Sequence, residues 1–408
     1  MTTLSQPRLD YLDAVRAFAL LLGIVFHASL SFMPIFIGWA VMDISTSQAV
    51  AVFGMISHSF RMELFFLIAG FFSHMTYHRL GWQGFLKSRV VRIGLPFVVG
   101  WFVLRPLLVA GWIAGMQSMR GDEQWLLAFK EGFASLGDLP SNLFVGTHLW
   151  FLYYLFFITL AVVLLRNAIG LLPSVADTFK RASDSLIAWL CSSPMGLFVI
   201  ALPTILCLWF MQRWGVDTPD QSLWPHLPVT ALYAGCFVFG WCLQRQGTLI
   251  QRWGKLSWGR GILACVAALI CVLLSPYESQ PGHMYFAEIK LAFTVAYAVM
   301  MWSMVVVSLG VCSRLFSKAS KWVRYVADAS YWLYLIHLPI VVGLQVVFAE
   351  LPLHWLVKLF SICIITMVIS IALYEAFVRT SFIGATLNGK RKPHVWTLES
   401  KSDAHLTR

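Results

Sequence analysis

The sequence predicts an all-α membrane protein, a polytopic bundle of about ten transmembrane helices. Hydrophobic residues make up 59% of the 408 residues and charged residues only 12%. That is too few charges to cover the surface of a soluble domain of this length. The apolar residues fall in runs of roughly 20, the length that crosses a hydrocarbon core of about 30 Å. Backbone polar groups in lipid must be satisfied within each segment, so these runs predict helices.

The spans follow one another along almost the whole chain. They are predicted at about residues 12–35, 50–76, 93–114, 147–168, 195–212, 227–244, 260–276, 288–311, 325–349 and 355–378.

Lys and Arg gather in every second connection between these spans. Lys87, Arg89 and Arg92 precede the third span, and similar basic clusters follow the fourth, sixth, eighth and tenth. The intervening connections are poor in Lys and Arg, and Asp43 is the only charge in the first of them. By the positive-inside rule, this alternation predicts an even number of spans in a bacterial inner membrane, with both termini cytoplasmic. It also explains the net charge of +11 without a nucleic-acid-binding surface.

The first apolar run begins near Tyr11 and extends past Phe32. It is longer than the core of a signal peptide, about 7–15 residues, and is expected to remain as a membrane helix. One transmembrane domain is expected over residues 1–385, followed by a short basic cytoplasmic tail over 386–408. The longest extramembrane stretches are expected at about 115–146 and 169–194. The eight cysteines form no C-x-x-C pair, so neither a disulfide framework nor a metal site is indicated.

Ionisable residues inside spans are costly and mark candidate functional sites. In the first span, Arg16 and His27 are eleven residues apart, which places them on one helix face about 16 Å apart. Arg16 is expected near the cytoplasmic end and His27 past the middle. The alternative is structural: a histidine bonded to a neighbouring helix and an arginine that reaches the membrane surface.

The second span carries three polar groups within six residues, His58, Arg61 and Glu63. An arginine and a glutamate at membrane depth must find partners on other helices. The three together favour a lined cavity over a single structural ion pair.

Further candidates lie on the third, fourth and ninth spans. His148 and Trp150 begin the fourth span, where an aromatic residue can also be an ordinary membrane-interface anchor. Tyr331, Tyr334 and His337 form a stripe on the ninth span that could equally hydrogen-bond between helices. Weaker candidates are Arg105 in the third span and the Tyr374-Glu375 pair in the tenth.

In these residues the chain resembles the membrane-bound acyltransferase-3 family. The resemblance rests on Asp13-x-x-Arg16 followed by ten residues and His27, on Lys87-x-Arg89-x-x-Arg92, and on the span of Tyr331 and His337. It covers about residues 8–380. It implies transfer of an acyl group from a cytoplasmic acyl-CoA to a carbohydrate hydroxyl outside the membrane. Further segments, around His58, His148 and Tyr374, resemble family members that succinylate osmoregulated periplasmic glucans, which implies a succinyl-CoA donor and a glucan acceptor.

Acyl transfer to a hydroxyl needs a base that titrates near neutrality, and histidine meets that requirement. His27 is the expected general base, and a covalent acyl-histidine intermediate remains an alternative. An oxyanion donor is also needed. The predicted catalytic residues are His27, Arg61, His58, Tyr334 and His337. Those for the acyl-CoA donor are Arg16, Lys87, Arg89 and Arg92, and those for the acceptor or acyl group are Asp13, Glu63, Arg105, His148 and Trp150. No tightly bound cofactor and no metal are expected.

Three partners are expected: the lipid bilayer, the envelope carbohydrate and other glucan-biosynthesis proteins. One rival reading is an O-acetyltransferase of another envelope polysaccharide or lipopolysaccharide, which would run the same chemistry with a different acyl group. Another is a glycan transporter or flippase. That would be favoured by paired half-repeats or by matched Gly/Pro interruptions, and the sequence shows neither.

Overall fold

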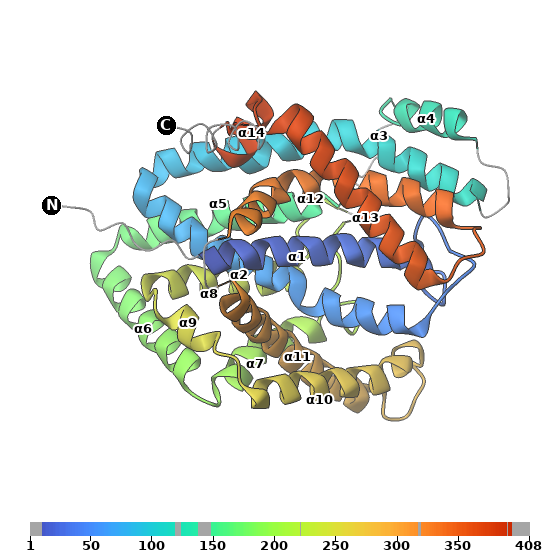
Figure 1. Ribbon diagram of the computed structural model, residues 1–408. Coiled ribbons are helices and arrows are strands. Elements are labelled where there is room, and N and C mark those ends of the chain that lie inside the picture. Colours follow the sequence, from blue (N-terminus) through green and yellow to red (C-terminus); the bar gives the residue numbers. More distant parts are fainter. Residues whose placement is uncertain are drawn as a thin grey trace, which may run out of the picture. The chain divides into compact units, whose positions relative to one another are not determined.

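The computed structural model describes residues 10–118, 124–137, 148–220, 222–316, 320–389 and 391–393. Helices account for nearly all of its regular structure, and the described residues contain no β-strand (Figure 1). The α-helices are α1 (Asp10–Ser29), α2 (Gln48–Arg89), α3 (Leu95–Ser118), α4 (Trp125–Ala134), α5 (Trp150–Gly170), α6 (Pro173–Ser192), α7 (Gly196–Trp209), α8 (Leu227–Arg245), α9 (Leu249–Trp253), α10 (Trp258–Leu274), α11 (Phe286–Leu315), α12 (Lys321–Phe348), α13 (Trp355–Leu373) and α14 (Phe382–Asn388). Short 3₁₀ segments occupy Leu30–Phe32 and Ser275–Ser279, and π-helical segments occupy Val90–Gly94 and Tyr374–Val378.

The apolar helices confirm a polytopic membrane protein. Within the described ranges, 8 helical runs are long and apolar enough to cross a membrane, or up to 9 if one bent pair counts as a span. One run, Gln48–Ser118, has 71 residues, which at about 1.5 Å per residue is far longer than one crossing. It contains the two spans predicted at 50–76 and 93–114. Between them, Gly81 interrupts the helical conformation with φ 68 and ψ 175.

The span predicted at 195–212 forms only a short helix. The 14 residues of α7 reach about 21 Å, and α7 meets α6 at an angle of 113° across the break at Ser193–Met195. Pro203 lies inside α7, where a missing N–H and a ring clash weaken a helix. The helix α7 therefore lies within the span predicted at 195–212 but ends at Trp209.

The two long connections are partly helical. The connection predicted at 169–194 contains α6, which is polar and exposed along its first half and buries Ile187, Leu190 and Cys191. The connection predicted at 115–146 contains α4, which packs against α3. Residues 119–123 and 138–147 of it lie outside the described residues, as does most of the predicted tail.

The chain divides into two compact units. The first unit comprises residues 1–22, 52–85 and 157–324, and the second comprises 23–51, 86–156 and 325–408. In the first unit, α10 packs along α11 and α11 packs along α7.

Two glycines allow α2 and α8 to approach closely within the first unit. A Cβ on Gly70 would lie 1.9 Å from the carbonyl oxygen of Phe237, and a Cβ on Gly240 would lie 1.9 Å from that of Leu67. Such backbone contact through small residues is a common way of packing helices in membranes.

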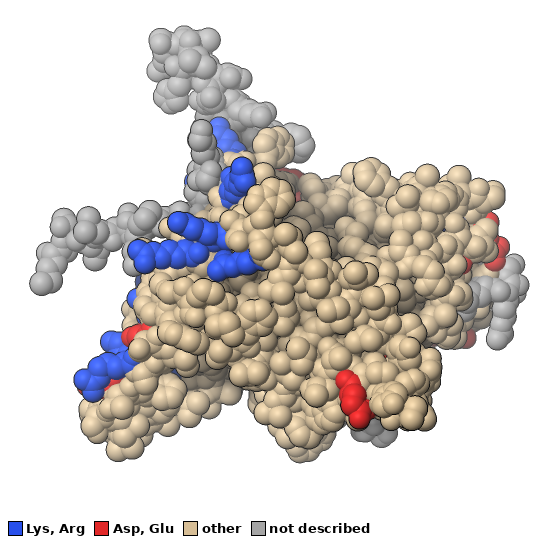
Figure 2. All heavy atoms as spheres, turned by 90° about the horizontal axis from the view of Figure 1, so that it is seen from below, with Lys and Arg blue, Asp and Glu red and all other residues tan. Residues whose placement is uncertain are grey.

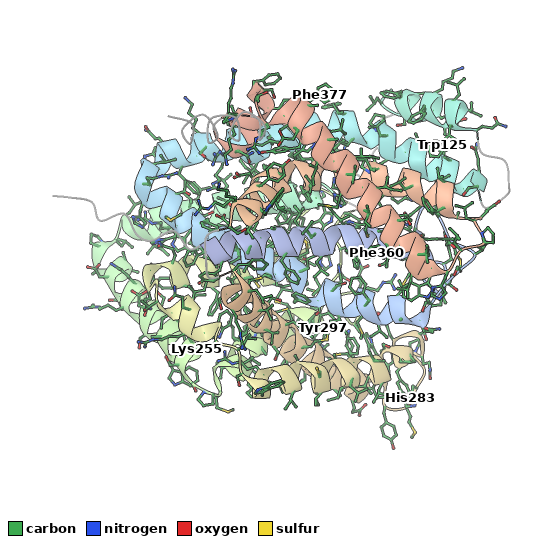
Figure 3. The ribbon with its side chains drawn as sticks, viewed as in Figure 1. Trp125, Lys255, His283, Tyr297, Phe360 and Phe377 are labelled. Atoms are coloured by element: carbon green, nitrogen blue, oxygen red, sulfur yellow. The ribbon has the colours of Figure 1, made fainter. Side chains whose placement is uncertain are left out.

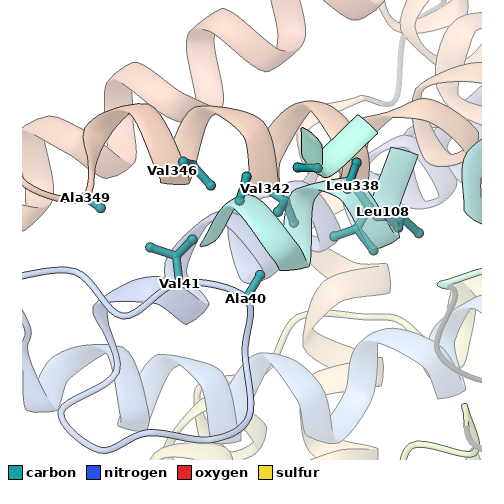
Figure 4. Packing of buried hydrophobic residues seen from close by; sticks show 10 residues of the cluster. Ala40, Val41, Leu108, Leu338, Val342, Val346 and Ala349 are labelled. Carbon is teal, nitrogen blue, oxygen red and sulfur yellow. The ribbon is translucent and has the colours of Figure 1, made fainter. Parts of the chain in front are cut away.

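The second unit has a hydrophobic cluster that joins a loop to three helices (Figure 4). Ala40 and Val41 come from the loop after α1, and they pack with Leu108 of α3 and Val342 of α12. The remaining members are Ala110, Ala114, Ala128, Leu338, Val346 and Ala349. The loop is thus held against the helices that carry the candidate site.

Large apolar side chains point away from the helices, as a lipid-facing surface requires. Phe360 on α13 is 71% exposed and Phe377 in the following π-helical segment is 63% exposed (Figure 3). The face drawn in Figure 2 carries few charged side chains. In water such a surface would be an aggregation hazard, whereas in lipid it is the expected exterior.

Candidate functional site

Two histidines from distant parts of the chain meet in the second unit. His27 lies near the C-terminal end of α1 and His337 in the middle of α12, and His27 Nδ1 is 3.0 Å from His337 Nε2. The two rings are stacked with centroids 5.2 Å apart. Both are predicted catalytic residues, but nothing in the sequence indicates that they touch.

The backbone around His337 determines the proton positions in this pair. His337 Nδ1 lies 2.7 Å from the carbonyl oxygen of Tyr334 and 3.2 Å from that of Leu333. Because a carbonyl can only accept, Nδ1 carries the proton in neutral His337 and its Nε2 is an acceptor. His27 must therefore donate from Nδ1, which leaves Nε2 of neutral His27 unprotonated. This assignment follows from the hydrogen-bond network.

A tryptophan and a glutamine complete the surroundings of His27. The indole of Trp39 lies parallel to the His27 ring, with an interplanar angle of 4° and centroids 6.0 Å apart. Trp39 Nε1 donates to Gln345 Oε1 at 2.9 Å. Gln345 Nε2 in turn donates to the carbonyl oxygens of His27 at 2.9 Å and Ala28 at 3.1 Å. One side chain thus connects the backbone and the stacking partner of His27.

His148 and Tyr334 lie next to this pair. Tyr334 donates its hydroxyl proton to the carbonyl oxygen of His148 at 2.6 Å, and His148 Nε2 donates to the carbonyl oxygen of Leu335 at 2.9 Å. The His148 ring contacts the His337 ring edge-on with centroids 5.3 Å apart. The stripe predicted on the ninth span therefore faces the beginning of α5. Trp150, two residues further along, packs against Tyr154.

Three of the predicted donor-binding residues, Lys87, Arg89 and Arg92, lie at the start of the second unit's second segment of chain, in and before the π-helical turn. Lys87 is exposed, and Arg89 and Arg92 are half-buried. Tyr331 donates to the carbonyl oxygen of Arg92 at 2.6 Å. The Arg92 guanidinium lies against Gly389, where any Cβ would be 1.7 Å from Nη2. Arg105, in contrast, donates from Nη1 to the carbonyl and hydroxyl oxygens of Ser135, each at 3.0 Å.

The other predicted residues belong to the first unit. Arg16 and Asp13 form an ion pair on α1 at 3.7 Å. His58 Nε2 donates to the carbonyl oxygen of Val216 at 3.0 Å, and Arg61 is buried. Glu63 is fully buried, and no other described residue hydrogen-bonds to either of its carboxylate oxygens.

The hydroxyl of Tyr297 on α11 accepts from the backbone N–H of Val216 at 3.4 Å (Figure 3). Val216 therefore connects Tyr297 to His58 on α2 within this unit.

An ion pair that was not predicted lies behind the loop that carries Trp39. Lys358 Nζ is 2.6 Å from Asp43 Oδ1, and the two side chains are 0% and 1% exposed. Burial raises the pKa of the Asp43 carboxyl, and Lys358 and the backbone N–H of Ser45 oppose that shift. A lysine in the tenth apolar run was a sequence signal for such a partner. Trp39, in a loop without periodicity, gave none.

Comparison with known proteins identifies the family of the chain. Residues 9–375 match a family described as an acyltransferase domain. Glucans biosynthesis protein C from Salmonella gallinarum is 28% identical over 397 residues, which covers 96% of this chain and 97% of the relative. The protein of the same name from Salmonella paratyphi B is 27% identical over 404 residues, with the same shares covered. No solved structure matches the chain. Since the family match extends over most of its length, the chain belongs to the acyltransferase-3 family of membrane proteins.

Proposed function

We propose that this protein transfers a succinyl group from cytoplasmic succinyl-CoA to hydroxyls of periplasmic glucans in the bacterial inner membrane, with His27 as the general base. The family supports acyl transfer, and the name of the relatives supports a glucan acceptor. The observation that carries the assignment of the base is the His27–His337 pair.

The proton positions in the His27–His337 pair allow His27 to act as a base. His27 holds its proton on Nδ1 against His337, so Nε2 can take a proton from the acceptor hydroxyl as the oxygen attacks the thioester carbonyl. The resulting imidazolium is stabilised by its Nδ1–H bond to His337, the role that a carboxylate has in a Ser-His-Asp triad. Collapse of the tetrahedral intermediate breaks the C–S bond, and the proton on Nε2 passes to the departing CoA sulfur. The products are the acylated hydroxyl and free CoA thiol, and no other reactant is needed.

The basic residues before α3 supply positive charge that can bind the anionic acyl-CoA donor. Lys87, Arg89 and Arg92 lie on the predicted cytoplasmic side, where the phosphates of CoA are available. Arginine can bind a phosphate through two parallel hydrogen bonds. A succinyl carboxylate requires a cation at membrane depth, for which Arg61 and Arg105 are the two candidates. Arg105 donates to Ser135, so this role requires those bonds to be exchanged. Arg16 remains a candidate for donor binding, and Asp13 remains a candidate for binding the acceptor or acyl group.

The test compares His27→Ala with His283→Ala, a histidine in the loop before α11. Each variant is expressed in cells that lack the wild-type protein, and the periplasmic glucans are analysed by mass spectrometry. We expect His27→Ala to abolish the succinyl mass gain while the protein still inserts in the membrane, and His283→Ala to retain it. Unchanged succinylation with His27→Ala would refute the assignment of the base.

The same spectra separate the proposed reaction from its nearest alternative. A gain of acetyl instead of succinyl, in the glucans or in another envelope polysaccharide, would indicate an O-acetyltransferase with the same residues. Purified protein that neither consumes succinyl-CoA nor modifies a glucan would contradict an enzymatic role.

A further inference from the structure

The loop between α1 and α2, residues 33–47, is closed and anchored by a set of hydrogen bonds; we call it the strap. At its base, the N–H of Asp43 donates to the carbonyl oxygen of Ser31 at 2.8 Å and that of Ser47 to Phe32 at 3.0 Å. The strap therefore returns to its starting point, as compact loops of about 6–16 residues often do.

The strap is also attached to the turn between α12 and α13. Lys358 Nζ binds both Asp43 Oδ1 at 2.6 Å and the carbonyl oxygen of Ala349 at 3.1 Å. The N–H of Trp355 donates to Ser45 Oγ at 3.0 Å. Because both charges of the ion pair are buried, removal of one partner leaves the other charge buried and unpaired, which is strongly destabilising.

These hydrogen bonds and the Asp43–Lys358 ion pair hold Trp39 in its position. Ala40 and Val41 are packed in the hydrophobic cluster (Figure 4), and the residue before them places its indole parallel to the His27 ring. On the opposite edge, Trp112 of α3 contacts the Trp39 ring with centroids 5.1 Å apart. Trp39 is thereby held between a helix, Gln345 and the proposed base.

We propose that the strap is a positioning element for catalysis, in which the buried Asp43–Lys358 pair keeps Trp39 against His27 and so fixes the orientation of the His27 ring. This inference rests on the proposed role of His27. Trp39 and Lys358 are positioning residues, since they act through His27.

The orientation of the His27 ring affects catalysis because the imidazole can rotate and has two nitrogens. Nδ1 must meet His337 for Nε2 to face the acceptor, and a displacement of about 1 Å can reduce a rate about 100-fold. Loss of the stacked indole opens space on one face of the ring. Loss of Gln345 frees the carbonyl oxygens of His27 and Ala28 and releases Trp39.

The experiment measures kcat and the KM for succinyl-CoA of purified protein with extracted glucan as acceptor. Trp39→Leu and Lys358→Met should each reduce kcat about 10–100-fold, with KM changed by less than about threefold. Trp39→Phe and Lys358→Arg, which retain an aromatic ring and a cation, should keep more of kcat than the first two. Lys290→Met is the matched control, because Lys290 and the residue whose carbonyl it binds, Trp209, both belong to the first unit. It should leave kcat unchanged.

A combined variant separates positioning from a loss of stability. Because Trp39 and Gln345 act on one ring orientation, Trp39→Leu/Gln345→Leu should lose little more kcat than the worse single variant. This comparison does not require Lys358→Met to fold. Multiplied losses in the double variant, or a wild-type kcat for folded Trp39→Leu, would overturn the inference.

His27→Ala in the same assay keeps the two proposals apart. If His27→Ala is active, the proposed base is wrong. If it is inactive while Trp39→Leu and Gln345→Leu have wild-type kcat, only the role of the strap is wrong.

Discussion

At the scale of single residues, the chemistry of the site depends on which nitrogen of each imidazole holds its proton. A neutral histidine can be a base at either ring nitrogen, and the hydrogen bond made by one nitrogen selects the other. In this protein the selection begins with two backbone carbonyls of α12, passes through His337 and ends at His27. The helical spacing of Leu333, Tyr334 and His337 is sufficient to set the first step.

This dependence predicts unequal effects of two substitutions at His337. His337→Leu removes the acceptor for His27 Nδ1–H, so the ring is free to present the wrong nitrogen. The expected loss in kcat is roughly 100- to 10,000-fold, as for the removal of the orienting group of a triad. His337→Gln keeps an oxygen that can accept from Nδ1 and should retain more activity. Equal activities of both variants, measured with saturating succinyl-CoA and glucan, would show that His337 does not orient His27.

The sequence predicts the individual residues of the candidate site better than it predicts the contacts between them. His27 and His337 were identified because ionisable groups are costly within apolar runs. Their pairing across 310 positions was not predictable, since hydropathy defines depth along a helix but not its rotation or neighbours. Gln345 could have been noticed, because it lies eight residues after His337 and extends the polar stripe of α12. Trp39 could not, because its position depends on anchors elsewhere in the strap.

At the scale of elements, the first unit depends on the close crossing of α2 and α8. Gly70 faces the backbone of Phe237, and Gly240 faces the backbone of Leu67. Without a hydrophobic driving force between helices in lipid, contact of this kind provides van der Waals attraction along the crossing. Glycine is unfavourable inside a helix, and the close packing of the two helices explains its presence at these two positions.

Alanine substitutions at different glycines of these two helices should change the free energy of unfolding in opposite directions. Gly70→Ala and Gly240→Ala place a Cβ within 1.9 Å of a backbone oxygen and should lower the free energy of unfolding by about 1–3 kcal/mol or more. Gly54 on α2 and Gly235 on α8 have nothing within 4 Å of an added Cβ. Alanine there should be neutral or stabilising by about 0.5–1 kcal/mol. Unfolding of the purified protein in detergent measures all four, and indistinguishable variants would contradict the crossing.

Element boundaries show where sequence prediction was limited. Long apolar runs identified α1, α5, α8, α10, α11, α12 and α13, because lipid imposes one length on every spanning helix. The run through Gly81 looked like two spans with a loop, yet the chain remains helical on both sides of a single residue. Its φ of 68 with ψ of 175 is a conformation open to glycine alone at low cost. The connections predicted as extramembrane stretches contain α4 and α6, helices that the average apolar content of a segment does not detect.

At the scale of the whole molecule, the second unit alone contains most of the residues assigned to the reaction. His27, His148 and His337 belong to it, as do the strap and the basic residues Lys87, Arg89 and Arg92. The first unit contains Arg16, His58, Arg61 and Glu63. A buried carboxyl without a hydrogen bond from another described residue is costly, so Glu63 is the residue of that unit for which a functional role would best explain its retention.

The proposed path of the acyl group across the membrane requires the strap and the basic loops to face opposite compartments. Thr46 in the strap and Lys255 in the α9–α10 connection, both exposed, lie on opposite sides according to the alternation of Lys and Arg. A cysteine at Thr46 should react with a membrane-impermeant maleimide in cells whose outer membrane has been opened. A cysteine at Lys255 should react only after the inner membrane is permeabilised.

The wild-type chain gives the background of this labelling, because its exposed Cys265 lies within an apolar span that the reagent does not enter. Labelling of both cysteines from the same side would mean an even number of crossings between them. Inverted labelling would place the strap and Trp39 in the cytoplasm and the basic residues outside. The donor could then no longer meet Arg89 and Arg92, because CoA thioesters are cytoplasmic, so this result would contradict the proposed path of the acyl group even if His27 is the base.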